Sequence, residues 1–135
     1  MFTSLESYEQ FIYQLPGHYP IITTSTLVLI RYGRYTAQVR GDIHFATQVR
    51  LQVYEELVAL QQVRLTAYGY EAWRGDEKLY WYDPQPHPHI PALASTHPHH
   101  KHIPPDMKHH RVPASGLSFT QPNLPFLIRE IEQLL

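Results

Sequence analysis

Histidine is concentrated in one short part of this sequence. Eight of the ten histidines lie between His87 and His110, in a stretch that also contains most of the prolines. Imidazole titrates near neutral pH, transfers protons and ligates metal ions, whereas a packed core has little use for so many of these rings. We therefore expect this stretch to carry the function, through metal binding or through catalysis.

The histidine spacing permits metal binding. His87 and His89, like His100 and His102, are two residues apart, so each pair would point to one side of an extended chain. Asp83, Asp106 or Glu55 could add an oxygen ligand, and the absence of cysteine excludes thiolate sites. We predict no native cofactor. Zinc or another divalent metal, held by His87, His89, His100 and His102, is the alternative.

Metal-independent RNA cleavage is the other possibility. The reaction needs a base for the 2′-hydroxyl, an acid for the leaving 5′-oxygen, and cations that stabilise charge at phosphorus. Histidines supply the first two roles, and Lys101, Arg50, Arg64 or Arg111 could supply the third. The sequence has neither a glycine-rich phosphate loop nor a Gly-x-Ser-x-Gly elbow, so other familiar active sites find no support.

Two amphipathic helices are expected at the ends of the chain. Apolar residues recur at helical spacing from Leu5 to Leu15, after a possible capping box that begins at Thr3, and Pro16 follows this pattern. A second apolar stripe runs from 124 to 135, with Asn123 as an effective N-cap. We expect both helices to cover the apolar side of a sheet.

The region between the helices reads as antiparallel β-structure. Alternating apolar and polar residues predict five strands, at about 20–31, 34–44, 47–58, 62–74 and 77–82. Their connections are too short for parallel crossovers, so consecutive strands should form a meander. We therefore predict one α+β domain over 1–135, with a strongly curved five-stranded sheet and a long irregular His/Pro-rich loop at 84–122.

Alternation also assigns side chains to the two faces of this sheet. Val49, Leu51, Leu65 and Trp81 fall on the apolar face. The opposite face collects arginine, glutamine and tyrosine residues, among them Arg50, Arg64, Tyr68, Tyr70, Tyr80 and Tyr82. Such a face is either solvated or a platform for RNA, and we expect the histidine loop to fold back over it.

Bulk charge and hydropathy limit the cellular setting. The formal net charge is −1 with neutral histidines, so a nucleic-acid partner is not indicated by total charge. No segment approaches the roughly 20 apolar residues that span a bilayer, and the N-terminus lacks the features of a signal peptide. We expect a cytoplasmic protein with no membrane partner.

The histidine stretch resembles the TumE-type toxins of prokaryotic toxin–antitoxin pairs. The resemblance is carried by Tyr82-Asp83-x-x-Pro86-His87-x-His89 followed by His99-His100-Lys101-His102, where the family has Tyr-Asp-Asn and Pro-His-His-Pro before His-His-Lys-His. Weaker matches are Leu51-x-Val53-x-Glu55 and Tyr68-x-Tyr70. Gly69 and Glu71 depart from the family pattern, which has arginine and histidine at these positions. The resemblance implies a small α+β toxin, neutralised by a cognate antitoxin, that inhibits growth through RNA.

Together these observations predict a toxin that acts as a metal-independent endoribonuclease. His100 and His102 would transfer protons, Lys101 and Arg50 would bind phosphate, and Glu55 would orient an imidazole. Tyr68, Tyr70 and Tyr82 would stack on or position the RNA, with Arg64 and His87 as further contacts. The alternatives are a non-catalytic module that binds a metal or a partner, and a degenerate toxin homologue. A homodimer is also possible.

Overall fold

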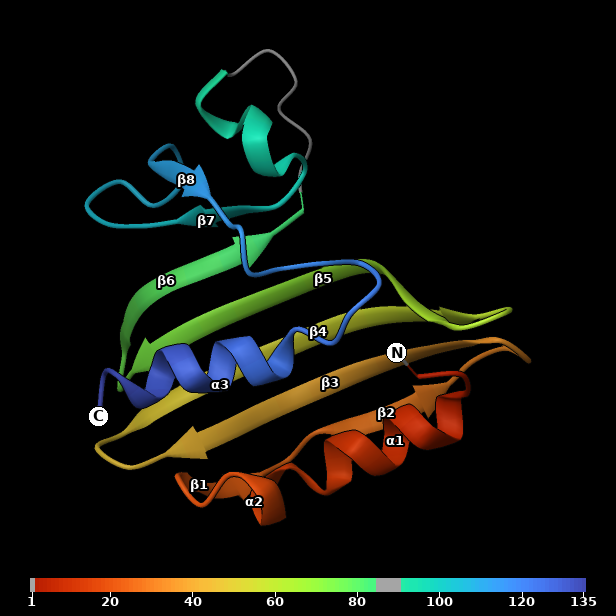
Figure 1. Ribbon diagram of the computed structural model, residues 1–135. Coiled ribbons are helices and arrows are strands. Elements are labelled where there is room, and N and C mark those ends of the chain that lie inside the picture. Colours follow the sequence, from red (N-terminus) through yellow and green to blue (C-terminus); the bar gives the residue numbers. More distant parts are fainter. Residues whose placement is uncertain (1, 85–90) are drawn as a thin grey trace.

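The computed structural model describes residues 2–84 and 91–135, and it shows an eight-stranded antiparallel sheet with helices on one face (Figure 1). The strand order is β1-β3-β4-β5-β6-β7-β8, and β2 also pairs with β3. The strands are β1 (Ile22–Ser25), β2 (Val28–Arg31), β3 (Thr36–Phe45), β4 (Val49–Ala59), β5 (Val63–Arg74), β6 (Glu77–Asp83), β7 (His100–His102) and β8 (Arg111–Pro113). The α+β class is confirmed, but the sheet has more strands than predicted and is not strongly curved.

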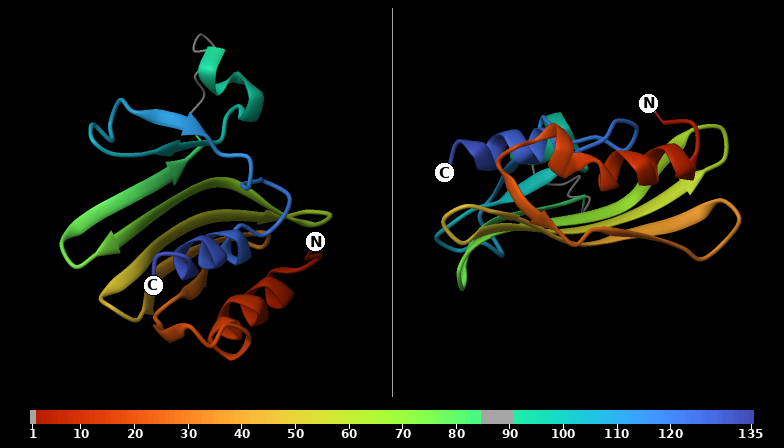
Figure 2. Two further views of the ribbon diagram at one scale, coloured as in Figure 1. Left: turned by 60° about the vertical axis from the view of Figure 1, so that its left-hand side comes forward. Right: turned by 90° about the horizontal axis from the view of Figure 1, so that it is seen from below.

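Both predicted terminal helices are present and lie on the same side of the sheet (Figure 2). The first is α1 (Leu5–Tyr13), with Ser4 rather than Thr3 as N-cap: its hydroxyl accepts a hydrogen bond from the Ser7 amide at 3.1 Å. One further turn, α2 (Leu15–His18), follows directly, because proline is tolerated in the first turn of a helix. The last helix, α3 (Leu124–Glu132), begins after Asn123 as predicted.

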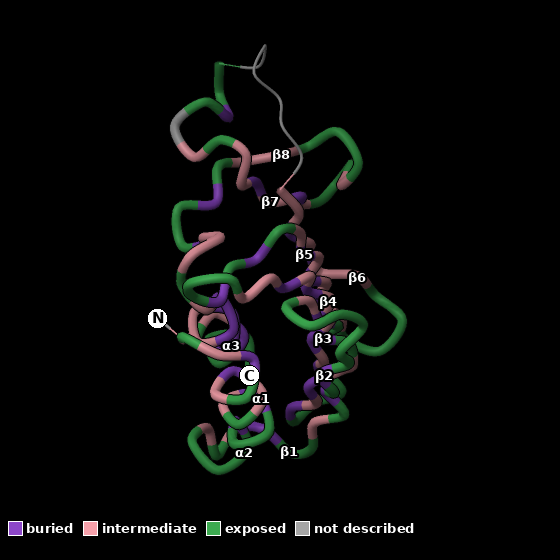
Figure 3. The backbone as a smooth tube through the Cα atoms, turned by 90° about the vertical axis from the view of Figure 1, so that its right-hand side faces the viewer, coloured by how far each residue is buried: buried purple, intermediate pink, exposed green. Residues whose placement is uncertain are grey.

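The core lies between the sheet and the helices α1 and α3 (Figure 3). Ile12 and Leu15 come from the N-terminal helices, Leu51 from β4, and Leu127 and Ile131 from α3, and each is fully buried. Burial of a side chain of this size contributes about 1.5–3 kcal/mol. Truncation of Leu127 to alanine would therefore remove about 2–5 kcal/mol, once the resulting cavity is included.

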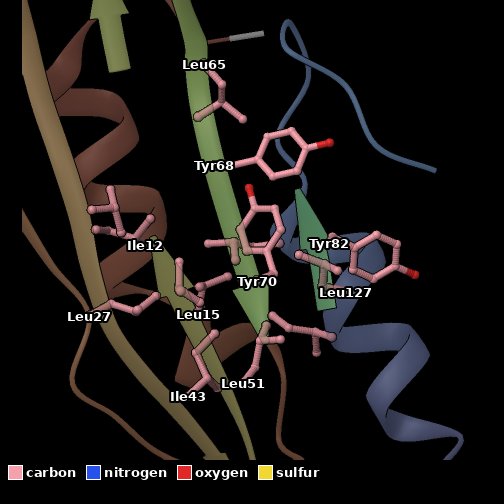
Figure 4. Packing of buried hydrophobic residues seen from close by; sticks show 14 of the residues in the cluster. Ile12, Leu15, Leu27, Ile43, Leu51, Leu65, Tyr68, Tyr70, Tyr82 and Leu127 are labelled. Carbon is pink, nitrogen blue, oxygen red and sulfur yellow. The ribbon is translucent and has the colours of Figure 1, made fainter. Parts of the chain in front are cut away.

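A β-bulge in β5 reverses the alternation that the sequence suggests. The register with β4 shifts between Leu65 and Ala67, so Thr66 is an extra residue in β5. Beyond the bulge, Tyr68 and Tyr70 are buried in the core, on the same side as Leu127 of α3 (Figure 4). The prediction that these tyrosines share a face with the arginines of β4 and β5 is wrong for this reason.

A second irregularity separates Trp81 from the core. The β5–β6 register shifts after Ala72, which pairs with Tyr80, so that Trp73 pairs with Lys78. Tyr80 and Tyr82 are therefore buried beneath α3, and Trp81 leaves the sheet on the opposite face. The sequence-based assignment of Trp81 to the apolar face, and of Tyr80 and Tyr82 to the polar face, is the reverse of what the structure shows.

Gly41 belongs to β3 and lies opposite the point where the chain passes from β1 to β2. Its φ angle is 138°, and a Cβ atom at this position would lie 2.6 Å from the carbonyl oxygen of Thr26. The Thr26 amide donates a hydrogen bond to the Asp42 carbonyl at 2.8 Å, which holds the two segments close together. The strand predicted over 20–31 is therefore two short strands, and both pair with β3.

The predicted irregular loop at 84–122 is partly regular structure. Its described part contains a 3-10 helix (Pro91–Thr96) and the strands β7 and β8. Antiparallel pairing of β7 with β6 extends the sheet at its edge, so the strand that carries His100 and His102 does not fold back over a face of the sheet. Among the residues of this segment that the structure describes, only the later ones do so, where Leu117 and Phe119 pack against the core. None of the helices in the described part of the chain is long and apolar enough to cross a bilayer.

Candidate functional site at the β6–β7 edge

The pairing of β6 with β7 distributes the His-His-Lys-His block between the two faces of the sheet. Trp81 pairs with His102, Tyr82 with Lys101, and Asp83 with His100. Side chains alternate along a strand, and directly paired residues share a face. His100 and His102 therefore lie with Asp83 on the outer face, which is the face of the sheet that the helices do not cover. Lys101 lies on the face that the helices cover.

On the outer face, three side chains direct one atom each toward a common point. The Nε2 atoms of His100 and His102 are 3.0 Å apart, and both face Oδ1 of Asp83, at 2.6 and 3.3 Å. Both imidazoles are almost fully buried, with 1% and 3% of their residue surfaces exposed, while the Asp83 side chain is 21% exposed. Among the described residues, this is the one group of three side chains arranged as metal ligands.

The second nitrogen of each ring is held by the backbone. Nδ1 of His100 lies 3.2 Å from the carbonyl oxygen of Pro98, and Nδ1 of His102 lies 2.6 Å from that of Met107. The Trp81 ring packs against His102 with a centroid separation of 4.1 Å. These contacts fix the orientation of both imidazoles relative to Asp83.

A shallow groove of about 230 Å³ reaches this site from the outer face of the sheet. Its wall includes Gly69, Glu71, Lys78 and Trp81, and it ends at Asp83. Lys78 Nζ lies 4.3 Å from the centroid of the Trp81 ring and 3.1 Å from the Glu71 carboxylate. Ligands would therefore approach the histidine pair through the partly exposed Asp83.

Cations and aromatic rings continue along the outer face beyond the groove. The Arg50 guanidinium lies 4.9 Å from the centroid of the Trp73 ring, and Lys78 Nζ lies 5.3 Å from the same ring. On β3 and β4, Arg40 lies 4.7 Å from the centroid of the Tyr54 ring. The outer face thus places positive charge beside π surfaces, as binding sites for single-stranded nucleic acid do.

Lys101 and Tyr82 form a separate group beneath α3. Both side chains bind the Glu130 carboxylate: Lys101 Nζ donates at 3.0 Å, and the Tyr82 hydroxyl donates at 2.8 and 2.9 Å. Burial and the nearby Glu130 charge raise the pKa of Tyr82, so its phenol stays protonated. These two candidates of the sequence analysis do not meet the histidine pair and instead connect β6 and β7 to the last helix.

Glu55 lies in the core, remote from the imidazoles it was predicted to orient. Its two carboxylate oxygens accept hydrogen bonds of 2.5 Å from the hydroxyls of Tyr8 and Tyr70. The Asn123 amide also donates to the Tyr70 hydroxyl, at 3.1 Å. Burial raises the pKa of Glu55 and outweighs the opposing effect of the two tyrosine hydrogen bonds. This network joins α1, the sheet and the start of α3.

Tyr68 contacts a different histidine from those expected. Its hydroxyl lies 2.6 Å from Nδ1 of His99, and the two rings are stacked at 5.7 Å beside Phe119. Burial, followed by the charge of Asp83, raises the pKa of Tyr68, so the phenol keeps its proton and donates it to the ring nitrogen. Burial also lowers the pKa of His99, with smaller effects from His100 and His97.

The structure thus brings together only part of the predicted site. Arg50 lies on the outer face and Arg64 is exposed on β5, outside the groove that ends at Asp83. His87 and His89 lie outside the described residues, so the part of His87 in substrate binding and the part of both residues in metal binding stay predictions. Lys78 and Trp81 are not among the site residues predicted from the sequence, and Asp83 was predicted only as a possible oxygen ligand.

Fold and site define a small α+β protein whose histidine-based site lies at one edge of an antiparallel sheet. Residues 12–135 match the family described as Toxin TumE. Because this match covers nearly the whole chain, the protein belongs to the TumE toxin family, and the resemblance seen in the sequence is confirmed. No curated protein and no solved structure matched the chain.

Proposed function

We propose that this toxin inhibits growth by cleaving RNA in the cytoplasm, and that a cognate antitoxin neutralises it. Membership of a toxin family supports the first part. The observation that carries the proposal is the convergence of His100 and His102 on Asp83 at the end of an outer groove. Buried groups of this kind, open to solvent on one side, are typical of active sites.

The outer face suits a single-stranded RNA substrate. Bases stack on aromatic side chains and cations bind the phosphates between them, largely independently of sequence. Trp81 and Trp73 offer π surfaces beside Lys78 and Arg50, and the groove itself is lined by Lys78, Trp81 and Asp83. Arg111 pairs with His102 across β7 and β8, so its side chain also leaves the sheet on the outer face, where it would bind the scissile phosphate.

The reaction we propose is transfer of the phosphodiester to the neighbouring 2′-oxygen. The site removes the 2′-hydroxyl proton, the 2′-oxygen attacks phosphorus, and the bond to the 5′-oxygen breaks as that oxygen gains a proton. The products are a 2′,3′-cyclic phosphate and a 5′-hydroxyl end. One imidazole of the His100–His102 pair accepts the 2′-hydroxyl proton, and the other, protonated beside Asp83, donates a proton to the 5′-oxygen. Lys78 and Arg111 stabilise charge on the phosphate oxygens.

Paired variants at the site test this function. Asp83→Asn keeps the size of the side chain but removes its charge, and His102→Asn removes one imidazole. The matched control is His109→Ala, because His109 is an exposed histidine of the same segment whose ring pairs with Asp106 at 3.0 Å, outside the groove. Growth after induction and cleavage of total RNA by purified protein are measured, with melting temperatures to confirm folding.

We expect both site variants to permit growth and to lose cleavage about 100-fold or more, as for removal of a general acid or base. His109→Ala should remain toxic. A folded Asp83→Asn protein that still blocks growth and cleaves RNA would refute the assignment. Toxicity without RNA cleavage in the wild-type protein would refute the ribonuclease function while leaving the toxin class intact.

A second candidate is a toxin homologue that binds its partner without catalysis. It is favoured by Gly69 and Glu71, which stand where the family pattern has arginine and histidine and which line the groove beside Asp83. A groove without those two groups would bind RNA less strongly and transfer protons less readily. Harmless overproduction of the wild-type chain without its antitoxin would support this candidate.

A further inference from the structure

The tautomers of the two site histidines follow from their backbone contacts. A carbonyl oxygen only accepts hydrogen bonds, so Nδ1 of His100 and Nδ1 of His102 carry the protons that face Pro98 and Met107. In a neutral imidazole, Nε2 then carries no proton, and its lone pair points into the site. Histidine ligands of metal ions show this arrangement, with the outer nitrogen donating to a carbonyl and the inner nitrogen binding the ion.

Three electron-rich atoms therefore face one another in a buried place. The two Nε2 atoms and Asp83 Oδ1 are separated by only 2.6, 3.0 and 3.3 Å. A proton on Nε2 of His100 would stabilise the contact of that ring with Asp83. It would leave the Nε2 lone pair of His102 facing the same carboxylate oxygen, so that second contact would remain unfavourable. A single positive ion among the three atoms stabilises all of their contacts at once.

We infer that Asp83, His100 and His102 form a binding site for one divalent transition-metal ion. Ligand bonds of about 2.0–2.2 Å to nitrogen and carboxylate oxygen would hold these three atoms around one ion once the 2.6 Å contact of His100 with Asp83 widens toward tetrahedral spacing. Two imidazoles and one carboxylate select zinc and its neighbours in the first transition row, whereas magnesium and calcium prefer oxygen ligands.

The setting of the three ligands points to a catalytic rather than a purely structural ion. Three protein ligands leave a coordination position for water or substrate, whereas structural zinc sites are closed by four. The partly exposed Asp83 borders the groove that contains Lys78 and Trp81, so this position is accessible from the proposed RNA path. The ion would activate a nucleophile or stabilise phosphate charge. Metal binding stands on the site geometry, and only the ion's part in cleavage rests on the proposed function.

The test uses the full chain, freed of metal with a chelator and dialysed. Zinc chloride, and separately manganese chloride, is titrated by calorimetry, and the melting temperature is followed in parallel. Asp83→Asn and His102→Gln remove one ligand each. The control is the double variant Asp106→Asn/His109→Ala, which removes the exposed carboxylate–histidine pair that could bind zinc adventitiously.

We expect one tight zinc equivalent that raises the melting temperature of the wild-type and control proteins. Each ligand variant should lose at least tenfold in affinity for that equivalent. Asp83→Asn is decisive if His102→Gln fails to fold, because the side chain at 83 is partly exposed and keeps its shape. Unchanged zinc affinity in folded Asp83→Asn, or loss of the tight equivalent in the control, would overturn the inference.

Cleavage assays separate this inference from the proposed function. RNA cleavage that is lost with chelator and restored by zinc or manganese supports the metal site and the ribonuclease function, and it would replace proton transfer by His100 and His102 with chemistry at the ion. Chelator-resistant cleavage that Asp83→Asn still abolishes would overturn the metal's role and favour the metal-independent histidine scheme. Tight zinc binding at Asp83 without RNA cleavage would overturn the ribonuclease proposal and leave the metal site standing.

Discussion

Trp81 and His102 are paired residues of β6 and β7, and their ring centroids lie 4.1 Å apart. An ion bound to His102 would lie close enough to affect the indole. The chain has two tryptophans, so Trp73→Phe leaves Trp81 as the sole indole fluorophore. We expect one equivalent of Co²⁺ to quench its emission, and the further change Asp83→Asn to abolish the effect. Quenching that persists in this variant would show that cobalt reaches Trp81 from another site.

The Glu130 cluster is expected to stabilise the fold rather than to act on RNA. Lys101→Met removes a partly buried charge-assisted hydrogen bond to Glu130, which should lower the free energy of unfolding by about 1–2 kcal/mol. Glu130→Gln should cost a similar amount. Urea unfolding measures both effects. Loss of RNA cleavage by fully folded Lys101→Met, with Glu130→Gln fully active, would instead support the phosphate-binding role that the sequence suggests.

Buried Glu55 should make stability depend on pH. Burial raises its pKa above the ordinary value of 4.5, so the folded protein holds this proton more tightly than the unfolded chain does. Its stabilising contribution is complete below pH 4.5 and decreases as pH rises through the folded-state pKa. Glu55→Gln should therefore lose less stability than the wild-type protein between pH 4.5 and pH 8, measured by urea unfolding. Exposed Glu132→Gln is the control, and equal slopes for Glu55→Gln and wild type would contradict the expectation.

Gly41 and Gly17 should respond differently to an added methyl group. At Gly41, alanine would combine a φ of 138° with a Cβ atom 2.6 Å from the Thr26 carbonyl oxygen, and we expect more than about 1 kcal/mol of destabilisation. At Gly17, a Cβ atom meets no atom within 4 Å, so alanine should be neutral or slightly stabilising. Thermal unfolding compares the two. Equal melting temperatures would show that the β1–β2 crossing relaxes easily.

Restoring the family residues in the groove should raise activity. A Cβ atom at Gly69 comes no closer than 3.9 Å to the Tyr54 ring, so a side chain can begin there without a clash, at a position that lines the groove. Gly69→Arg/Glu71→His adds a cation and an imidazole beside Asp83, and we expect about tenfold faster RNA cleavage. Gly69→Ala is the steric control. No gain from the double variant would show that these positions do not limit the reaction in this chain.

Local patterns were sufficient to predict the helices, most of the strands and their antiparallel pairing. Apolar spacing located α1 and α3, and the short turns required consecutive strands to pair. The assignment of side chains to faces failed at Thr66 and Leu79, because a single extra residue reverses every later side chain in a strand. No local signal distinguishes such a bulge from regular alternation, so Tyr68 and Tyr82 were placed on the wrong face.

The histidine site was predicted in part for a similar reason. Its spacing correctly put His100 and His102 on one side of an extended segment, as the structure shows. The partner Asp83 is 17 residues from His100 in sequence, and their meeting depends on a strand pairing that proline-rich composition conceals. Lys101 was grouped with its sequence neighbours, although a residue between two others in a strand faces the opposite side.

Side chains alternate between the two faces along β7, so the site of Asp83, His100 and His102 forms only when β7 pairs with β6 in the observed register. A slip by one position against β6 would move His99 and Lys101 to the outer surface and turn both imidazoles of the pair inward, toward Tyr82 and α3. A charged amine would then replace nitrogen lone pairs opposite Asp83. A slip by one position therefore does not weaken this site gradually but removes it, because both imidazoles leave the face of Asp83 together.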